Sequence, residues 1–223
     1  MEALRRSASA HLVVDDVSAP IADDDAMHHL MRVLRLRDGA AITVTDGRGS
    51  WRPCVLAGAG LDPVGEVEQC ARGREVTVYT ALPKGDRGDW MVQKLVEVGV
   101  AEIVLVDAER SVVRWDPARR DRGLARLERI VRSAVEQSRR VHVPVVRGPV
   151  PADEVVSSIP VAEPGGRALR DDDTAVVIGP EGGWSQSELD LMADRVDLGD
   201  GVLRVETAAV VAATLMLAAG GPR

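Results

Sequence analysis

The sequence predicts an α/β protein with a small N-terminal β module and a larger domain built on a mainly parallel sheet. The chain has 223 residues, of which 45% are hydrophobic and 28% charged, and this balance supports a substantial core. Short apolar runs separated by turn signals come first, and apolar runs that alternate with helical patterns follow. A charged run at residues 71–75 divides the two patterns, so we expect domains at residues 1–72 and 73–223.

The N-terminal module is predicted to contain four short strands and one helix. The strands are expected at residues 11–14, 41–46, 50–58 and 63–70. The tetrapeptide at residues 46–49, Asp-Gly-Arg-Gly, indicates a hairpin turn between the second and third strands. Apolar residues recur at helical spacing over residues 26–36, and Asp24 or Asp25 is expected to cap that helix.

The second domain is predicted to alternate strands with helices, which is typical of a parallel sheet covered on both faces. The strands are expected at residues 76–82, 102–107 and 174–179. The helices are expected near residues 86–98, 117–139, 185–193 and 205–219. Residues 147–173 are rich in Pro, Gly and Asp, and they are expected to form a loop with a short helix around residues 152–158.

The net charge of −7 conceals a segregation along the chain. Residues 110–147 hold 11 basic and 4 acidic side chains, whereas the segments on either side are acidic. A basic segment between acidic ones suits a protein that offers one face to a polyanion such as a nucleic acid. A solvated helix face is the alternative interpretation, because arginine-rich helices also occur without bound nucleic acid.

Cysteine content and hydropathy restrict where the protein acts. The two cysteines, Cys54 and Cys70, are too few for a disulfide framework and lack the spacing of metal ligands. The longest nearly apolar run, residues 208–219, is shorter than the roughly twenty residues that a membrane span needs. We therefore expect a cytoplasmic protein with no membrane span and no bound metal.

The sharpest local signal is a glycine loop between a buried strand and a helix. Residues 174–179 are followed by Pro180-Glu181-Gly182-Gly183, and Ser185 with Glu188 forms a capping-box pattern at the start of the helix. Glycines let backbone N–H groups approach a ligand closely, and ligands bind at the carboxyl ends of parallel strands. A tight turn that needs positive φ is the alternative. The loop matches neither the phosphate-loop nor the dinucleotide-binding fingerprint.

Two further segments combine turns with polar residues at helix starts. In residues 198–211, Arg204 and Thr207 stand at the start of an Ala-rich helix, where a helix N-terminus favours an anionic or polar ligand. An ordinary capped helix with an arginine that reaches solvent is the alternative. In residues 84–100, Lys84 follows a strand, and Gln93, Lys94 and Glu97 lie on a helix with an apolar face.

Taken together, the motifs resemble an ordered family signature. They are residues 84–87 (Lys-Gly-Asp-Arg), 93–94, 97–100, 109–111 (Glu-Arg-Ser), 136–138 (Glu-Gln-Ser), 178–184 (Ile-Gly-Pro-Glu-Gly-Gly-Trp), 198–199, 203–204 and 206–208, with 28–30 and 33–35 in the N-terminal module. This series is similar to the RsmE family of 16S ribosomal RNA uridine N3-methyltransferases in the SPOUT superfamily. The resemblance covers nearly the whole chain.

The resemblance implies a SPOUT-type trefoil-knotted domain preceded by a smaller PUA-like β-barrel domain. It also implies S-adenosylmethionine as cofactor, 16S rRNA or the 30S subunit as partner, and a homodimer formed through the knotted domain. The residues it implies for cofactor binding are Leu82, Ile178, Gly179, Pro180, Glu181, Gly182, Gly183, Leu198, Gly199, Leu203, Arg204, Thr207 and Ala208. The expected RNA-binding residues are Arg5, Arg6, His28, His29, Arg32, Arg35, Lys84, Arg87, Arg110, Arg119, Arg120 and Arg122.

Methylation of uracil N3 requires removal of an imide proton and stabilisation of the resulting anion. Arg204 is the leading candidate for holding a phosphate or the uracil oxygens, because guanidinium is a planar and permanently charged donor. Glu206 and Glu136 are the candidates for accepting the proton, although helix capping or a structural ion pair is an alternative role for each. A SPOUT methyltransferase with another RNA target, and a ribosome assembly factor without catalysis, are the alternative functions.

Overall fold

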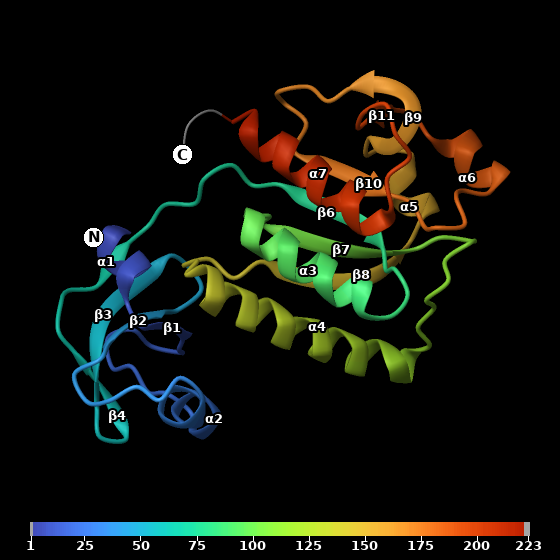
Figure 1. Ribbon diagram of the computed structural model, residues 1–223. Coiled ribbons are helices and arrows are strands. Elements are labelled where there is room, and N and C mark those ends of the chain that lie inside the picture. The colour runs from blue at the N-terminus through green and yellow to red at the C-terminus, as the bar shows by residue number, and fades with distance from the viewer. Residues whose placement is uncertain (1, 221–223) are drawn as a thin grey trace. The chain divides into compact units, whose positions relative to one another are not determined.

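The computed structural model describes residues 2–220, which form two compact units (Figure 1). The N-terminal unit contains residues up to 72 together with residues 132–143, and the C-terminal unit contains residues 73–131 and those from 144 onward. Met1 and residues 221–223, which the predicted domains include, lie outside the described residues. No sequence pattern indicated that residues 132–143 belong to the N-terminal unit.

The N-terminal unit is built on a five-stranded sheet. Its strands are β1 (Ala10–Val13), β2 (Ala41–Thr45), β3 (Ser50–Ala57), β4 (Gly60–Pro63) and β5 (Glu68–Gln69). The order is β1-β2-β3-β4, with β5 also paired to β3, and the predicted hairpin turn joins the antiparallel strands β2 and β3. The last predicted strand, residues 63–70, is wrong as a single element, because β4 ends at Pro63 and only Glu68–Gln69 returns to β3.

Helices of the N-terminal unit begin differently from the prediction. Helix α1 (Glu2–Ser7) was not predicted. Helix α2 (Asp24–His28) continues into a π-helical turn, η1 (His29–Val33), so the predicted helix is present. Its N-cap is Asp23, whose Oδ1 accepts a 2.7 Å hydrogen bond from Ala26 N–H, and neither Asp24 nor Asp25 has this role.

The C-terminal unit is built on a six-stranded sheet in which every pairing is parallel, as predicted. The strands are β6 (Thr77–Ala81), β7 (Glu102–Asp107), β8 (Val145–Pro151), β9 (Val161–Ala168), β10 (Ala175–Ile178) and β11 (Arg195–Asp197), in the order β11-β9-β10-β6-β7-β8. The helices are α3 (Asp86–Val98), α4 (Pro117–Ser138), α5 (Asp153–Val156), α6 (Gln186–Leu191) and α7 (Val205–Ala218).

Helices cover both faces of this sheet because strand residues alternate in direction. On β6, Thr80 donates from Oγ1 toward the Sδ of Met91 on α3, whereas Tyr79 packs with the apolar cluster beneath α5 and α6. Helix α7 lies beside α3 and packs on β6 and β10 (Figure 1). Among residues 2–220, no helix has both the length and the apolar character required to span a membrane.

The short helix predicted around residues 152–158 is present as α5, but the prediction of a loop over the rest of residues 147–173 is wrong, because much of this segment forms β8 and β9. Strand β8 lies at the edge of the sheet, where its prolines remove no hydrogen bond from a central ladder. In β9, a Cβ on Gly166 would stand 2.5 Å from the carbonyl carbon of Arg195, so glycine permits the close approach of β11. The Pro and Gly content that suggested a loop therefore reflects an edge strand and a close strand contact.

Residues 132–143 are bound to the N-terminal unit by backbone and side-chain contacts. Glu136 Oε1 accepts a 3.2 Å hydrogen bond from Val13 N–H, and Arg132 donates 2.8 Å to the carbonyl of Val13. The ring of His11 lies 2.9 Å (Nε2) from the carbonyl of Arg140 and 2.8 Å (Nδ1) from Thr43 Oγ1. Because a carbonyl only accepts, Nε2 carries the proton of the neutral ring and donates it to Arg140.

His11 predicts a pH dependence of stability. Its burial, with a smaller contribution from Arg5 and Arg139, lowers its pKa from 6.5 to about 4. Between these two pH values the unfolded chain therefore binds more protons than the folded one. The contribution of the His11 imidazole to the free energy of unfolding is complete above pH 6.5 and is lost as the pH falls through about 4. In urea unfolding, the free energy of unfolding of the wild-type protein should fall by about 2 kcal/mol between pH 7.5 and pH 5. The His11→Gln variant should lack this decrease. An equal loss in the variant would contradict this assignment.

Candidate functional site

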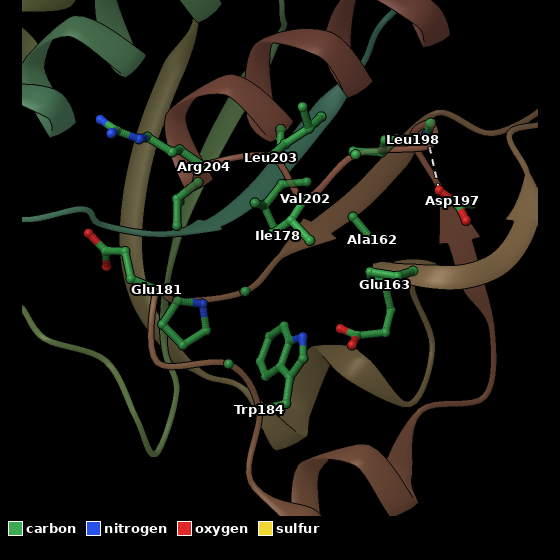
Figure 2. A pocket seen from close by; sticks show the side chains of 18 of the residues that line it. Ala162, Glu163, Ile178, Glu181, Trp184, Asp197, Leu198, Val202, Leu203 and Arg204 are labelled. Carbon is green, nitrogen blue, oxygen red and sulfur yellow. Dashed lines mark hydrogen bonds between the residues drawn. The ribbon is translucent and has the colours of Figure 1, made fainter.

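A cavity of about 830 Å³ opens at the carboxyl ends of the central strands of the C-terminal unit (Figure 2). Ala162 of β9 pairs with Ile178 at the end of β10, and β11 ends nearby at Asp197. The lining residues come from five segments: Lys84, Arg87, Val112, Ala162, Glu163, Pro164, Ile178, Gly179, Pro180, Glu181, Gly183, Trp184, Asp197, Leu198, Gly199, Gly201, Val202, Leu203, Arg204, Val205 and Ala208.

The glycine loop forms one wall of the cavity. A Cβ on Gly179 would stand 2.7 Å from Nε1 of Trp184, so glycine allows the buried indole ring to lie across the loop backbone. Gly183 has φ +68°, a conformation that glycine adopts without strain. The loop is therefore the tight turn with positive φ that the alternative interpretation expected, and it also lines a cavity. Its binding of a ligand stays a prediction.

Glu188 holds the glycine loop against a second loop. Ser185 and Glu188 form the predicted capping box, in which Glu188 Oε2 accepts from Ser185 N–H at 2.8 Å. The other oxygen, Oε1, accepts from Glu109 N–H at 2.8 Å, and Glu109 belongs to the loop after β7. The buried carboxylate thus satisfies two backbone donors, one from each loop.

Asp197 makes a similar connection on the opposite side of the cavity. Its carboxylate accepts hydrogen bonds from Gly165 N–H at 2.8 Å and Gly199 N–H at 3.0 Å, and these bonds lower its pKa. Asp197 thereby connects a bend within β9 to the turn that begins after β11. Beyond this turn, the side chains of Val202 and Leu203 stand at the cavity with little cover, and Val202 is 93% exposed.

Arg87 lies between two carboxylates. Its Nη2 donates to Glu181 Oε1 at 2.9 Å, and its Nη1 lies 3.8 Å from Glu206 Oε2. Glu206 is buried near the start of α7, and its Oε2 has no hydrogen-bond partner among the described residues. Arg87 was predicted to contact RNA, but its guanidinium is already engaged with the protein at this site.

Three other cationic side chains near the cavity, unlike Arg87, have no carboxylate partner among the described residues. Lys84 and Arg204 line the cavity, and Arg110 lies beside Gly182 in the loop after β7. Arg204 occupies the N-cap position of α7 but makes no side-chain cap, and its side chain is exposed. Within residues 2–220, no hydrogen bond or ion pair involves the charged groups of these three side chains. They are therefore available for an anionic ligand.

The structure brings most of the predicted cofactor residues together. Three do not line the cavity: Leu82, Gly182 and Thr207. Gly182 instead packs against the loop after β7, since a Cβ there would meet the carbonyl oxygen of Arg110 at 3.0 Å. Glu136 belongs to the N-terminal unit, where Val13 and Arg132 bind its carboxylate, and burial raises its pKa.

The remaining predicted RNA-binding residues lie in three places. Arg119, Arg120 and Arg122 are exposed on the first turns of α4. The surface around α2 and η1 carries the exposed side chains of His28, His29, Arg32 and Arg35. In the N-terminal helix α1, Arg6 pairs with Glu2, whereas Arg5 donates to the carbonyl of Arg139 at 2.8 Å.

Sequence reasoning missed several lining residues. Ala162, Glu163 and Pro164 were missed because their segment was predicted as a loop, and Glu163 points into the cavity (Figure 2). Val112 was missed because the predicted motif there ends at Ser111. Predicting a strand over residues 161–164 would have placed Ala162, Glu163 and Pro164 at the sheet edge that lines the cavity. Over residues 2–220, no group of His, Cys, Asp and Glu side chains could hold a metal ion.

Comparison with known proteins identifies relatives over most of the chain. A family model described as an RNA methyltransferase domain matches residues 71–217, and one described as an RNA methyltransferase PUA domain matches residues 22–64. The ribosomal RNA small subunit methyltransferase E of Mycobacterium bovis is 33% identical, with 89% of this chain and 86% of that protein covered. The enzyme of the same name from Bacillus subtilis is 29% identical, with 84% and 85% covered.

Solved structures agree with this comparison. A probable rRNA-methyltransferase from Porphyromonas gingivalis superposes with a TM-score of 0.77 at 31% identity, covering 95% of this chain and 98% of that one. A ribosomal RNA small subunit methyltransferase E from Neisseria gonorrhoeae, solved bound to S-adenosyl methionine, superposes with a TM-score of 0.81 at 27% identity, covering 94% and 97%.

Glu188→Gln should loosen the two loops that the carboxylate connects. One carboxamide oxygen can accept from only one of the two backbone donors, and the amide nitrogen would face the other. We expect the free energy of unfolding in urea to fall by about 1–3 kcal/mol. Asp190→Asn is the matched control, because this exposed carboxylate lies on the same helix and should change stability by less than about 0.5 kcal/mol. Equal effects of the two substitutions would contradict the bridging role.

Proposed function

The chain belongs to the RNA methyltransferase family, and from this premise we propose that it transfers a methyl group from S-adenosylmethionine to N3 of a uridine in 16S ribosomal RNA. The resemblance seen in the sequence motifs is confirmed by the family models and by relatives that cover most of the chain. The chain is an S-adenosylmethionine-dependent ribosomal RNA methyltransferase. What we propose beyond this assignment is the methylated atom, N3, and the uridine that carries it.

The cavity fits the cofactor in its size and chemistry. Its volume of about 830 Å³ accommodates a nucleoside with an amino-acid side arm. The apolar side chains of Ile178, Val202 and Leu203 lie in the middle of the view in Figure 2, and the carboxylates of Glu163 and Asp197 lie at one side, where they suit a cationic or hydroxyl-bearing ligand. When bound, S-adenosylmethionine supplies an electrophilic methyl group.

Arg204 is the residue that we propose stabilises the reacting base. Uracil N3 becomes nucleophilic when its proton leaves, and the negative charge then spreads to the neighbouring oxygens. A guanidinium donates two parallel hydrogen bonds and stays charged. Because Arg204 lines the cavity and has no partner among the described residues, it can turn to these oxygens without breaking a protein contact. This availability of Arg204 is the observation that carries the proposal.

Glu206 is the group that we propose accepts the N3 proton. Its Oε2 is buried, lacks a hydrogen-bond partner among the described residues, and lies two residues from Arg204 at the start of the same helix. A buried acceptor without a donor is costly unless a ligand supplies one. Arg87 stands 3.8 Å from this oxygen and holds a positive charge beside it. Glu136 has no part in this proposal, because its carboxylate is already bound within the N-terminal unit.

The dimer and the knot are further parts of the proposal. The outer side of α7 carries Thr207, Val210, Val211, Thr214 and Leu215, which are exposed or half-exposed and recur at helical spacing. A mainly apolar stripe on a helix suits pairing with a second copy. We propose this surface for a homodimer through the C-terminal unit, which we also propose to be knotted. An enzyme of ribosomal RNA acts where ribosomes are, so the proposed location is the cytoplasm.

Identification of the methylated nucleoside tests the function. The purified protein is incubated with labelled S-adenosylmethionine and either 30S subunits or protein-free 16S rRNA, and the RNA is digested and analysed by mass spectrometry. We expect labelled N3-methyluridine. A label on ribose or on another base would overturn the proposed target but leave an RNA methyltransferase, whereas cofactor binding without any labelled RNA would favour an assembly factor.

Arg204→Ala should lower turnover far more than cofactor affinity. Loss of a donor to the developing anion is expected to reduce kcat by on the order of a hundredfold. The Kd for S-adenosylhomocysteine, measured by calorimetric titration, should change by less than about threefold, since other groups also line the cavity. Arg37→Ala, an exposed arginine of the N-terminal unit, serves as the control and should retain wild-type turnover. A comparable loss of cofactor affinity in Arg204→Ala would assign this residue to cofactor binding instead.

A further inference from the structure

Five arginines from four separate segments gather on the N-terminal unit. They are Arg5 of α1, Arg48 of the β2–β3 turn, Arg72, and Arg139 and Arg140 that follow α4, and we call them the arginine cluster. Only Arg5 among them was predicted to contact RNA. The cluster depends on residues 132–143, which the fold returns to this unit, so the order of residues along the chain did not indicate it.

Arg5 and Arg139 are held together despite their like charges. Arg5 Nη1 donates to the carbonyl of Arg139 at 2.8 Å, and Arg139 Nη1 donates to the carbonyl of Arg5 at 2.8 Å. The guanidinium of Arg5 also lies over the ring of Trp51, 5.7 Å from its centroid. These contacts fix the positions of the two cations but bring no negative charge to them. Like charges held in proximity favour an anion at the same place.

The β2–β3 turn brings Arg48 to the same region. Gly49 N–H donates to the carbonyl of Val141 at 2.8 Å, and Val143 N–H donates to the carbonyl of Gly47 at 2.9 Å. A Cβ on Gly49 would stand 2.7 Å from Nε2 of His142, so this glycine allows the turn to lie against the histidine. The side chain of Arg48 is 76% exposed, and its Nε lies 3.7 Å from Asp46 Oδ2. This single long ion pair leaves most of the guanidinium at the surface, where a ligand can reach it.

The pKa values of His142 and His11 are lowered by burial and partly by the arginines of this cluster. Burial is the largest cause that lowers the pKa of His142, and Arg72, Arg140 and Arg5 lower it further, while Asp46 opposes them. Burial likewise dominates at His11, where Arg5 and Arg139 add to the effect. The N-terminal unit as a whole is not basic, because residues 2–72 and 132–143 hold 11 arginines and 12 carboxylates. The positive charge is therefore concentrated by the fold.

We propose that the arginine cluster is the surface through which the N-terminal unit binds the phosphodiester backbone of RNA. This inference rests on the proposed function, which makes RNA the substrate. Arginine forks match phosphate oxygens, and contacts to the backbone position an RNA without reading its sequence. Trp51 is buried beneath Arg5 and does not offer its face to a base, so the surface is suited to phosphates and not to base stacking.

The cluster also differs from the other predicted RNA surface of this unit. His28, His29, Arg32 and Arg35 lie near Asp23, Asp24 and Asp25 at the start of α2. These carboxylates repel phosphate and offset the nearby arginines. In the cluster, the one carboxylate that acts on His142 is Asp46. Its Oδ1 accepts hydrogen bonds from two N–H groups of its own turn, and its Oδ2 pairs with Arg48 at 3.7 Å. The cluster is therefore the stronger phosphate-binding surface of the two.

The test removes two exposed members of the cluster from the full-length protein. Binding of Arg48→Ala/Arg72→Ala to protein-free 16S rRNA is measured by filter binding over a series of KCl concentrations. We expect the Kd to rise at least about tenfold at low salt, and the slope of log K against log [KCl] to fall by about 0.7–0.9 per lost phosphate contact. Arg37→Ala/Arg170→Ala removes the same charge from exposed positions outside the cluster, and it should retain the wild-type slope.

The outcomes separate this inference from the proposed function. An unchanged Kd and slope in Arg48→Ala/Arg72→Ala, or an equal loss in the control variant, would overturn the cluster as an RNA surface. Calorimetric titration of the same double variant with S-adenosylhomocysteine should match the wild type, because neither residue lines the cavity. Absence of cofactor binding in the wild-type protein would refute the proposed methyltransferase function and leave the measured RNA surface standing.

Discussion

Parallel pairing of β10 between β6 and β9 is the constraint on which the candidate site depends. It brings the carboxyl end of β10 beside residues of β9, so loops that are distant in the chain meet at one edge of the sheet. Two carboxylates then fix these loops. Glu188 accepts backbone hydrogen bonds from Ser185 and Glu109, and Asp197 accepts them from Gly165 and Gly199. The loops around the cavity are therefore fixed by hydrogen bonds from backbone N–H groups to two side-chain carboxylates.

The charged groups of the two units divide into those that the protein already pairs and those that remain available. Arg87 is held by Glu181 and lies near Glu206, so it contributes to the architecture of the site. Lys84, Arg110 and Arg204 have no such partners among the described residues. In the N-terminal unit, Arg5 and Arg139 each donate to the other's carbonyl oxygen, and neither pairs with a carboxylate among the described residues. Arginine content alone does not distinguish these situations, because the distinction depends on neighbours brought by the fold.

Local patterns predicted the regular elements well where backbone preferences and burial agree. Helices at residues 86–98 and 117–139, and strands at residues 76–82 and 102–107, occur within one or two residues of their expected limits. The prediction of a loop was wrong over much of residues 147–173, because Pro and Gly are typical of loops. Here the prolines are tolerated in β8, which is an edge strand, and Gly166 permits the close approach of β11. That error also hid Glu163 from the list of site residues.

The sequence by itself determined the alternation of strands and helices, the capping box at Ser185 and the glycine loop, because these depend on residues within a few positions of one another. The motif series also indicated the family. Only the tertiary structure decided that Glu188 reaches Glu109, that Arg87 is engaged by carboxylates, and that Glu136 lies in the N-terminal unit. It also gathered five arginines from four segments. These facts depend on pairing between residues far apart in the chain, which no local propensity encodes.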